Sequence, residues 1–253
     1  MEVRDKLSTK ENFSSLIRMQ TEFIDDCKKD IQNLKNSEGK GIQLYSLPNI
    51  EVIQNKYETI LMYEYDNLLA TYSMGENIDR LLPLYKEIVS FMDIAWKKDN
   101  GYILMVNMLS IGILLDVEDT IFNKLAMIIQ KDKLNDFLIN YLLHHICKID
   151  VSLNISNFLF HRPYAATKEI ILFAEKDKMS SVKRLKKYLS QEWYRGHAGY
   201  GWHNIHKINV FAHSGYWSFE SGALVKLLGL DDSSLKGLPY YPYDMVHWND
   251  NIK

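Results

Sequence analysis

The sequence predicts an all-α protein built from two packed layers of antiparallel helices, with long helices in the first half and shorter ones in the second. Apolar residues recur with the three-and-four spacing of one helical face along most of the 253 residues. Glycine, proline and asparagine interrupt these stripes, and no segment shows the sustained alternation typical of a strand. Because each predicted helix is amphipathic, each must pack against another.

The first half contains the longest stripes. The predicted helices are residues 8–39, 53–75, 77–99 and 102–115. Ser8 and Glu11 form a capping-box pattern at the start of the first helix. Gly75 is expected to be a left-handed terminus, and Asp116 is placed to cap a fifth helix. The run 102–115 is apolar on every side, which indicates a helix buried nearly all round.

The second half has shorter stripes. Its predicted helices are residues 134–146, 163–174, 180–193 and 219–228. Ser218 is placed to cap the last of them, and Gly229 marks its left-handed end. We place a domain boundary near Asp132, so that residues 1–131 form an N-terminal helical domain and residues 132–253 a C-terminal one.

Composition excludes several classes of protein. The formal charge of −2 argues against global binding of nucleic acid, so electrostatic recognition should be local. Cys27 and Cys147 lack the spacing of a disulfide framework or a zinc site, which indicates a reducing compartment. The N-terminus has no apolar signal region, and the run 102–115 is too short to cross a bilayer. We therefore expect a cytoplasmic protein with no membrane partner.

Histidines concentrate in the C-terminal third of the chain, at His197, His203, His206, His213 and His247. With nearby carboxylates they could complete a zinc or iron shell, but no His-Glu-x-x-His pattern occurs. We interpret them as hydrogen-bonded core histidines and expect neither a metal nor another cofactor. The runner-up is a metal-dependent hydrolase that uses His203, His206, Asp231 and Asp232.

Aromatic side chains gather in the same region, including Trp193, Trp202, Trp217 and Trp248. They could form a platform for stacking bases, a partner-binding face or a core. A stacking platform needs a basic groove, and the neighbouring carboxylates would repel phosphate, so core packing is the preferred interpretation.

A basic run from Lys176 to Arg195 could form a DNA-reading helix and make the chain a DNA-binding regulator. Its charges lie opposite an apolar stripe, which favours a solvated helix face. Asp231 and Asp232 are placed to cap the following turn, and Glu220 lies near the positive end of a helix. No set of residues in the sequence has the spacing of a known catalytic motif.

Two strings near the end of the chain do resemble a known family. The stretch "GYWSFESGALVKLLGLDDSSLKGLPYYPYDMV" (215–246), preceded by "EWYRGHAGYGWHNIHK" (192–207), closely resembles the C-terminal signature of the PoNi family, the immunity proteins for the nuclease toxins called PoNe. The N-terminal half is similar more loosely, through Arg4, Asp5 and the "YSMG" of residues 72–75. Ser221 and Gly222 stand where the family string is expected to carry alanines. A glycine inside a helix costs about 1 kcal/mol, which suggests close packing at Gly222.

The resemblance implies an all-helical cytosolic protein that binds a DNase toxin delivered between competing bacteria. The expected function is stoichiometric inhibition of that cognate toxin, without catalysis. Exposed carboxylates would meet the cationic DNA-binding cleft of the nuclease. The candidates for toxin contact are Glu220, Asp231, Asp232 and Asp244. The residues expected to be structural are Trp193, Tyr194, Trp202, His206, Tyr216, Trp217, Tyr241 and Pro242.

Overall fold

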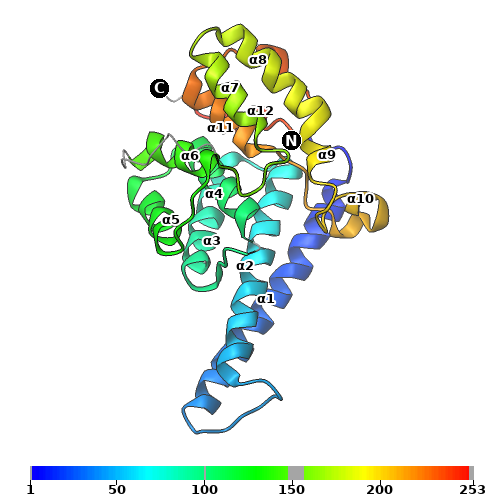
Figure 1. Ribbon diagram of the computed structural model, residues 1–253. Helices are drawn as coiled ribbons and strands as arrows, with labels where there is room; N and C mark the ends of the chain where they lie inside the picture. Colours follow the sequence, from blue (N-terminus) through cyan, green and yellow to red (C-terminus); the bar gives the residue numbers. More distant parts are fainter. Residues whose placement is uncertain (1, 100, 148–156, 251–253) are drawn as a thin grey trace. The chain divides into compact units, whose positions relative to one another are not determined.

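The computed structural model describes residues 2–99, 101–147 and 157–250, and within these ranges the chain forms helices, turns and loops without a strand (Figure 1). The all-α prediction is therefore confirmed. The chain divides into two compact units, one of residues 1–97 and 204–215 and the other of residues 98–203 and 216–253. The predicted domain boundary near Asp132 lies inside the second of these units, and it stays a prediction.

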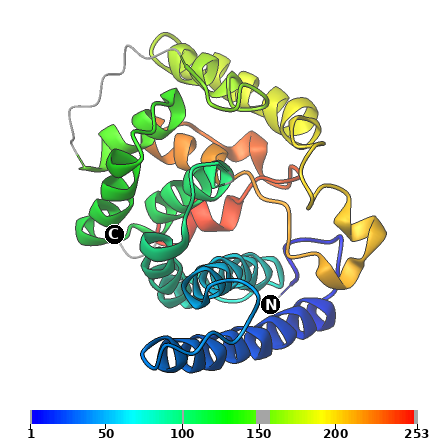
Figure 2. The ribbon, with the colours of Figure 1, turned by 60° about the horizontal axis from the view of Figure 1, so that its bottom comes forward.

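The first unit is organised by two long antiparallel helices, with a third packed on the second (Figures 1 and 2). Its helices are α1 (Lys10–Glu38), α2 (Asn49–Ser73), the short η1 (Ile78–Arg80), α3 (Leu81–Ala95), α10 (Ile205–Ile208) and η3 (Val210–Ala212). The prediction that Ser8 caps the first helix is wrong by one residue. Thr9 is the N-cap, and its Oγ1 accepts a hydrogen bond from the Asn12 amide at 3.2 Å.

The N-terminal residues are tied to the end of α2. The amides of Arg4 and Asp5 both donate to the carbonyl oxygen of Ser73, at 2.8 and 3.1 Å. Gly75 has a φ of +91°, and a Cβ there would lie 2.2 Å from the carbonyl oxygen of Glu2. Only glycine fits this left-handed position so close to another backbone. The two N-terminal motifs, Arg4-Asp5 and residues 72–75, are therefore in direct contact.

The second unit is built around α4, a helix with buried residues on every side, as predicted. Helix α11 packs against α4, and α12 packs against both. The helices of this unit are α4 (Tyr102–Leu115), α5 (Asp119–Lys131), α6 (Phe137–Cys147), α7 (Ala166–Ala174), α8 (Lys178–Lys187), the π-helix η2 (Tyr188–Trp193), α9 (Tyr194–Gly196), α11 (Phe219–Leu228), η4 (Ser233–Leu235) and α12 (Tyr243–His247).

Two expectations about helix ends in this unit are corrected. Asp116 does not cap α5: it is the left-handed C-terminal residue of α4, with a φ of +56°. The predicted helix 180–193 is instead α8, whose N-cap Asp177 accepts from the amides of Met179 and Ser180, followed by the π-helix η2. In the described part of the chain, no helix has both the length and the apolar character that a bilayer crossing requires.

Candidate functional site

The candidate site is the C-terminal signature region of the second unit, where aromatic rings pack in layers. The rings of Tyr194 and Tyr240 stack in parallel at 5.2 Å, and those of Trp193 and Trp202 stack at 5.9 Å. The Tyr216 hydroxyl donates to the carbonyl oxygen of Trp202 at 3.0 Å. Trp193 and Tyr216 are each only 4% exposed. Stacked aromatic rings, together with a tyrosine hydroxyl that has a hydrogen-bond partner, are typical of a packed core.

The other residues expected to be structural differ in burial. Tyr241 and Pro242 are buried, whereas Trp217 and Trp202 are only partly buried. His206 is also partly buried, and it belongs to the first unit, with its ring 5.7 Å from that of His213. The signature therefore contains both core residues and residues that reach the surface.

The aromatic cluster is joined to the turn before α7 through His197, which is fully buried. One ring nitrogen, Nδ1, lies 2.7 Å from the carbonyl oxygen of Trp193, and the other, Nε2, lies 3.0 Å from the hydroxyl of Tyr164. Burial lowers the pKa of His197 to about 4, although the hydrogen bond to Trp193 opposes this shift. The imidazole is therefore neutral near pH 7. With Nδ1 donating to the carbonyl, Nε2 accepts from Tyr164, so both nitrogens are used in the scaffold.

Glu220 does not lie on the surface, which corrects the expectation that it is an exposed carboxylate. It is fully buried near the start of α11, a helix in which every residue from Phe219 to Val225 is buried. Its Oε1 accepts from the Tyr188 hydroxyl at 2.9 Å and from the Ser218 hydroxyl at 2.7 Å. Burial raises the pKa of Glu220, and these hydrogen bonds oppose the shift.

Ser218 also departs from its predicted role. Its hydroxyl makes no capping bond to α11 and instead joins Glu220 to Ser221, whose Oγ lies 2.6 Å away. Gly222 follows in the same helix, and a Cβ there would lie 3.0 Å from side-chain atoms of both Pro242 and Val246. The close packing expected at Gly222 is therefore confirmed, and Gly229 ends the helix with a φ of +59° as predicted.

The neighbouring aspartates have different environments. Asp231 is exposed, and its Oδ1 accepts from the Ser233 amide at 3.0 Å, so it caps the following turn as predicted. This backbone hydrogen bond lowers the pKa of Asp231. Asp232 is only 4% exposed, which corrects its expected exposure. Its Oδ2 accepts from the Tyr241 hydroxyl at 2.6 Å, and its Oδ1 lies 2.9 Å from Nε2 of His247.

His247 therefore connects α12 to Asp232, the residue directly before η4. Its second nitrogen, Nδ1, lies 2.5 Å from Oδ2 of Asp250. Burial alone would lower the pKa of His247, but the two aspartates outweigh it and raise the pKa. Of the four candidate carboxylates, only Asp231 and Asp244 are exposed, and their contact with a toxin stays a prediction.

The histidines and aspartates of the hydrolase alternative have separate surroundings. The ring of His203 lies 4.2 Å from that of Tyr194, while His206 belongs to the other unit. Asp232 is paired with His247, and Asp231 holds the turn. Among the described residues, no group of three or more histidine, cysteine, aspartate or glutamate side chains is arranged to hold a metal. The geometry thus gives no support to that alternative.

A polar network in the first unit was not predicted from the sequence. The buried His213 ring, through Nε2, lies 2.9 Å from Oδ2 of Asp5. Arg4 lies over the Tyr72 ring at 4.7 Å and donates to the carbonyl oxygens of Tyr72 and Glu76. These contacts give the N-terminal motif residues a structural role, since they fix residues 4–5 and 213 against α2.

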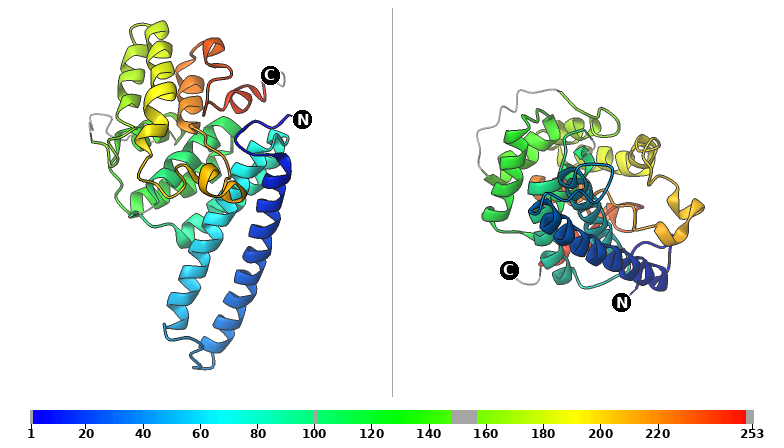
Figure 3. Two further views of the ribbon diagram at one scale, coloured as in Figure 1. Left: turned by 90° about the vertical axis from the view of Figure 1, so that its right-hand side faces the viewer. Right: turned by 90° about the horizontal axis from the view of Figure 1, so that it is seen from below.

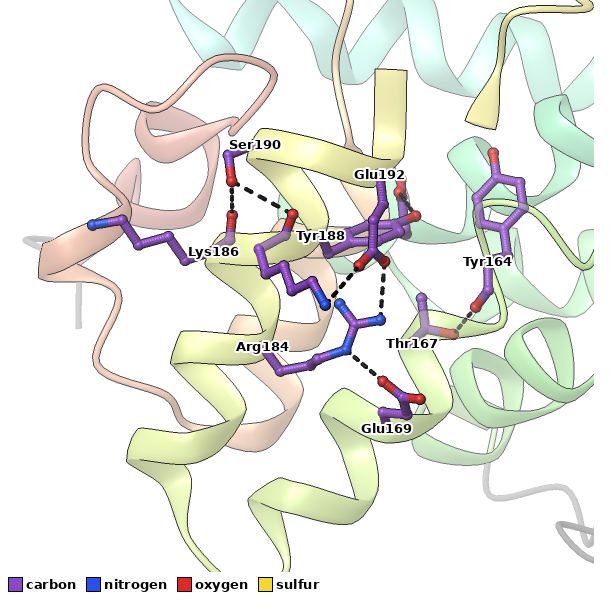
Figure 4. Close-up of polar contacts among 10 residues, drawn as sticks. Tyr164, Thr167, Glu169, Arg184, Lys186, Tyr188, Ser190 and Glu192 are labelled. Atoms are coloured by element: carbon purple, nitrogen blue, oxygen red, sulfur yellow. Dashed lines mark hydrogen bonds and ion pairs between the residues drawn. The ribbon is translucent and has the colours of Figure 1, made fainter. Parts of the chain in front are cut away.

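The basic helix contains one arginine that is paired with two carboxylates of its own unit. Figure 4 shows Arg184 between Glu169 and Glu192, at 2.5 and 2.9 Å. Leu185 and Leu189 of the same segment are buried, while Lys183, Lys186 and Lys187 are exposed. This confirms the interpretation of an amphipathic helix with a solvated basic face.

Arg184 also borders a hollow of about 640 Å³ between α7 and the segment ending at Gly196. Phe158, Pro163 and Leu172 line its apolar part, and Arg162 and Arg195 add positive charge. The hollow contains no nucleophile paired with a base, and its two carboxylates are those held by Arg184. The lining of the hollow is therefore partly charged and partly apolar.

Comparison with solved structures identifies the fold. The crystal structure of protein PA2201 from Pseudomonas aeruginosa has a TM-score of 0.57 and 17% sequence identity, covering 100% of this chain and 99% of that one. A likeness at this identity concerns the fold alone. A comparison with curated proteins finds no match.

Two family descriptions match the sequence and together cover nearly all of it. The description "PoNe immunity protein (PoNi), N-terminal" matches residues 4–127, and "PoNe immunity proteins (PoNi), C-terminal" matches residues 131–245. The molecule is therefore an immunity protein and not an enzyme. It belongs to the PoNi family, which implies neutralisation of a PoNe nuclease toxin.

Proposed function

We propose that this chain binds the nuclease domain of one cognate PoNe toxin in a one-to-one complex and blocks its DNase activity without catalysis or a cofactor. It does so in the cytoplasm of the toxin-producing bacterium, where the toxin would otherwise reach DNA. The observation that carries the proposal is the family membership over residues 4–127 and 131–245.

The geometry supports a binding role through a rigid scaffold. His197 and Glu220 are fully buried and hydrogen-bonded, and they connect segments that lie far apart in the sequence. A scaffold of this kind presents its surface with little conformational freedom to lose on association. Inhibition at low cellular concentrations requires a long-lived complex, so we expect an interface on the order of 1,600 Å² and nanomolar or tighter affinity.

Two of the predicted contact residues lie on the surface, where charge can act on a partner. Asp231 and Asp244 are exposed, and negative charge there would complement the cationic cleft with which a DNase binds its substrate. Glu220 and Asp232 would act indirectly, because each holds the fold of the C-terminal segment through buried hydrogen bonds.

Co-expression in bacteria tests the proposal. A PoNe-type nuclease toxin, sought among the genes next to this one, is expressed alone and together with this chain. A catalytically inactive variant of the toxin is the control. We expect loss of viability and fragmented DNA with the toxin alone, and survival with intact DNA when this chain is present. Cell death despite abundant folded protein would contradict the proposal, and rescue from an unrelated nuclease would contradict its specificity.

A further inference from the structure

The loop between α1 and α2 exposes an unusual amount of apolar side-chain surface. Within residues 39–48 only Lys40 is charged, although a quarter of the whole chain is. The exposed apolar residues at this end of the hairpin, here called the apolar tip, are Ile42 (51% exposed), Leu44 (48%), Tyr45 (50%), Leu47 (44%) and Ile50 (66%). Figure 3 shows this loop at the end of the hairpin, away from the N-terminal residues of the same unit.

The backbone of the loop is held in place by a buried side chain. Asn49 is 2% exposed, and its Oδ1 accepts from the Leu44 amide at 3.1 Å. Its Nδ2 donates to the Ile42 carbonyl oxygen at 2.7 Å and to Oε2 of Glu38 at 3.0 Å. The apolar side chains therefore face outward from an ordered loop, which reduces the entropy lost when a partner binds.

Folding of the chain leaves the side chains of the apolar tip in contact with water. Single exposed apolar residues are ordinary, whereas several gathered on one loop favour an interaction surface. About half of each of these five side chains is exposed, which corresponds to an apolar surface on the order of 400 Å². A standard complex buries about 800 Å² on each partner, and an obligate dimer buries more. The apolar tip is therefore too small to hold a dimer by itself, and its size suits the central part of a heterologous interface.

The chemistry of the apolar tip also restricts its partner. The five side chains of the apolar tip carry no charge to complement the cationic DNA-binding surface of a nuclease, and the exposed carboxylates Glu38 and Glu51 lie only on either side of it. A protruding apolar loop is best matched by an apolar concavity, where its side chains lose contact with water. We propose that the apolar tip inserts into an apolar cleft of the cognate nuclease toxin and forms the desolvated centre of the complex. This inference rests on the proposed function.

The test compares three purified proteins for binding to the toxin's nuclease domain. The first is the wild-type chain, and the second carries Leu44→Ser, Tyr45→Ser and Leu47→Ser. The control carries Met127→Ser and Met179→Ser, which replace side chains that are 68% and 67% exposed elsewhere. We expect the triple variant to bind about 100-fold more weakly, mainly through faster dissociation, and the control to bind like wild type.

Several results would overturn the inference. If wild type inhibits the toxin and the folded triple variant binds equally well, the apolar tip is not the contact, although the proposed function stands. If wild type is a dimer by light scattering and the triple variant is a monomer with unchanged toxin affinity, the apolar tip holds two copies together. If wild type itself does not bind, the proposed function fails first. If the triple variant does not fold, Tyr45→Ser alone tests whether the apolar tip contacts the toxin. We expect this single substitution to weaken binding about tenfold.

Discussion

Replacement of Glu220 by alanine should destabilise the protein strongly, because this carboxylate is part of the core. It is fully buried and accepts hydrogen bonds from the hydroxyls of Tyr188 and Ser218. Alanine leaves both donors without this acceptor, at about 1–3 kcal/mol for each donor left unsatisfied. Ser218 retains Ser221 as a neighbour at 2.6 Å, which reduces the loss. We expect the free energy of unfolding to fall by about 2–4 kcal/mol.

Glu220→Gln is the comparison variant: its amide oxygen can accept the same two hydrogen bonds, but its NH2 group takes the place of Oε2, a buried atom with no hydrogen-bond partner among the described residues. We expect it to lose about 1–2 kcal/mol through this unsatisfied amide group, less than Glu220→Ala, and to inhibit the toxin as wild type does. Chemical denaturation followed by circular dichroism measures the stabilities, and DNA cleavage measures inhibition. Wild-type stability in Glu220→Ala would refute the structural role. A folded Glu220→Gln variant that no longer inhibits would instead make Glu220 a toxin contact.

Two further predictions concern charge. Burial raises the pKa of Asp66 from 3.8 to about 6, although hydrogen bonds from Ser214 and Gln20 oppose this shift. Ionisation of Asp66 therefore destabilises the folded state as the pH rises from about 4 through 6. The cost at pH 7 is at most about 3 kcal/mol, since the residue is partly exposed. Asp66→Asn should therefore be more stable than wild type at pH 7 and lose that advantage near pH 4; denaturation curves showing a constant difference would contradict this. Asp244→Lys should slow toxin association, more at low salt than at high salt, and unchanged stopped-flow rates would place Asp244 outside the interface.

The helices were predictable from sequence because their signals are local. The stripe of the buried helix 102–115 and the glycine at 229 correspond to α4 and the left-handed end of α11. Exact caps were less predictable, since neighbouring residues compete for one role. Thr9 rather than Ser8 reaches the Asn12 amide, and Asp116 ends one helix instead of beginning the next.

The candidate site was harder to predict because burial depends on segments distant in the sequence. From the sequence alone, Glu220 is expected to be an exposed carboxylate at the start of a helix. In the structure it accepts a buried hydrogen bond from Tyr188, 32 residues earlier in the chain. Asp232 is likewise covered through Tyr241 and His247. The apolar tip did have a sequence signal, because residues 39–50 contain five large apolar side chains and one charged one. Its meaning becomes clear only when these residues are known to lie at the end of a hairpin.

The central claim, stoichiometric inhibition of one nuclease, is tested most directly by titration. A fixed amount of the toxin's nuclease domain cleaves DNA while the folded chain is added in increasing amounts, at toxin concentrations well above the expected dissociation constant. The account predicts that cleavage falls in proportion to the added chain and stops near a one-to-one ratio, while an unrelated nuclease is unaffected. Full cleavage at a several-fold excess of folded chain would contradict it.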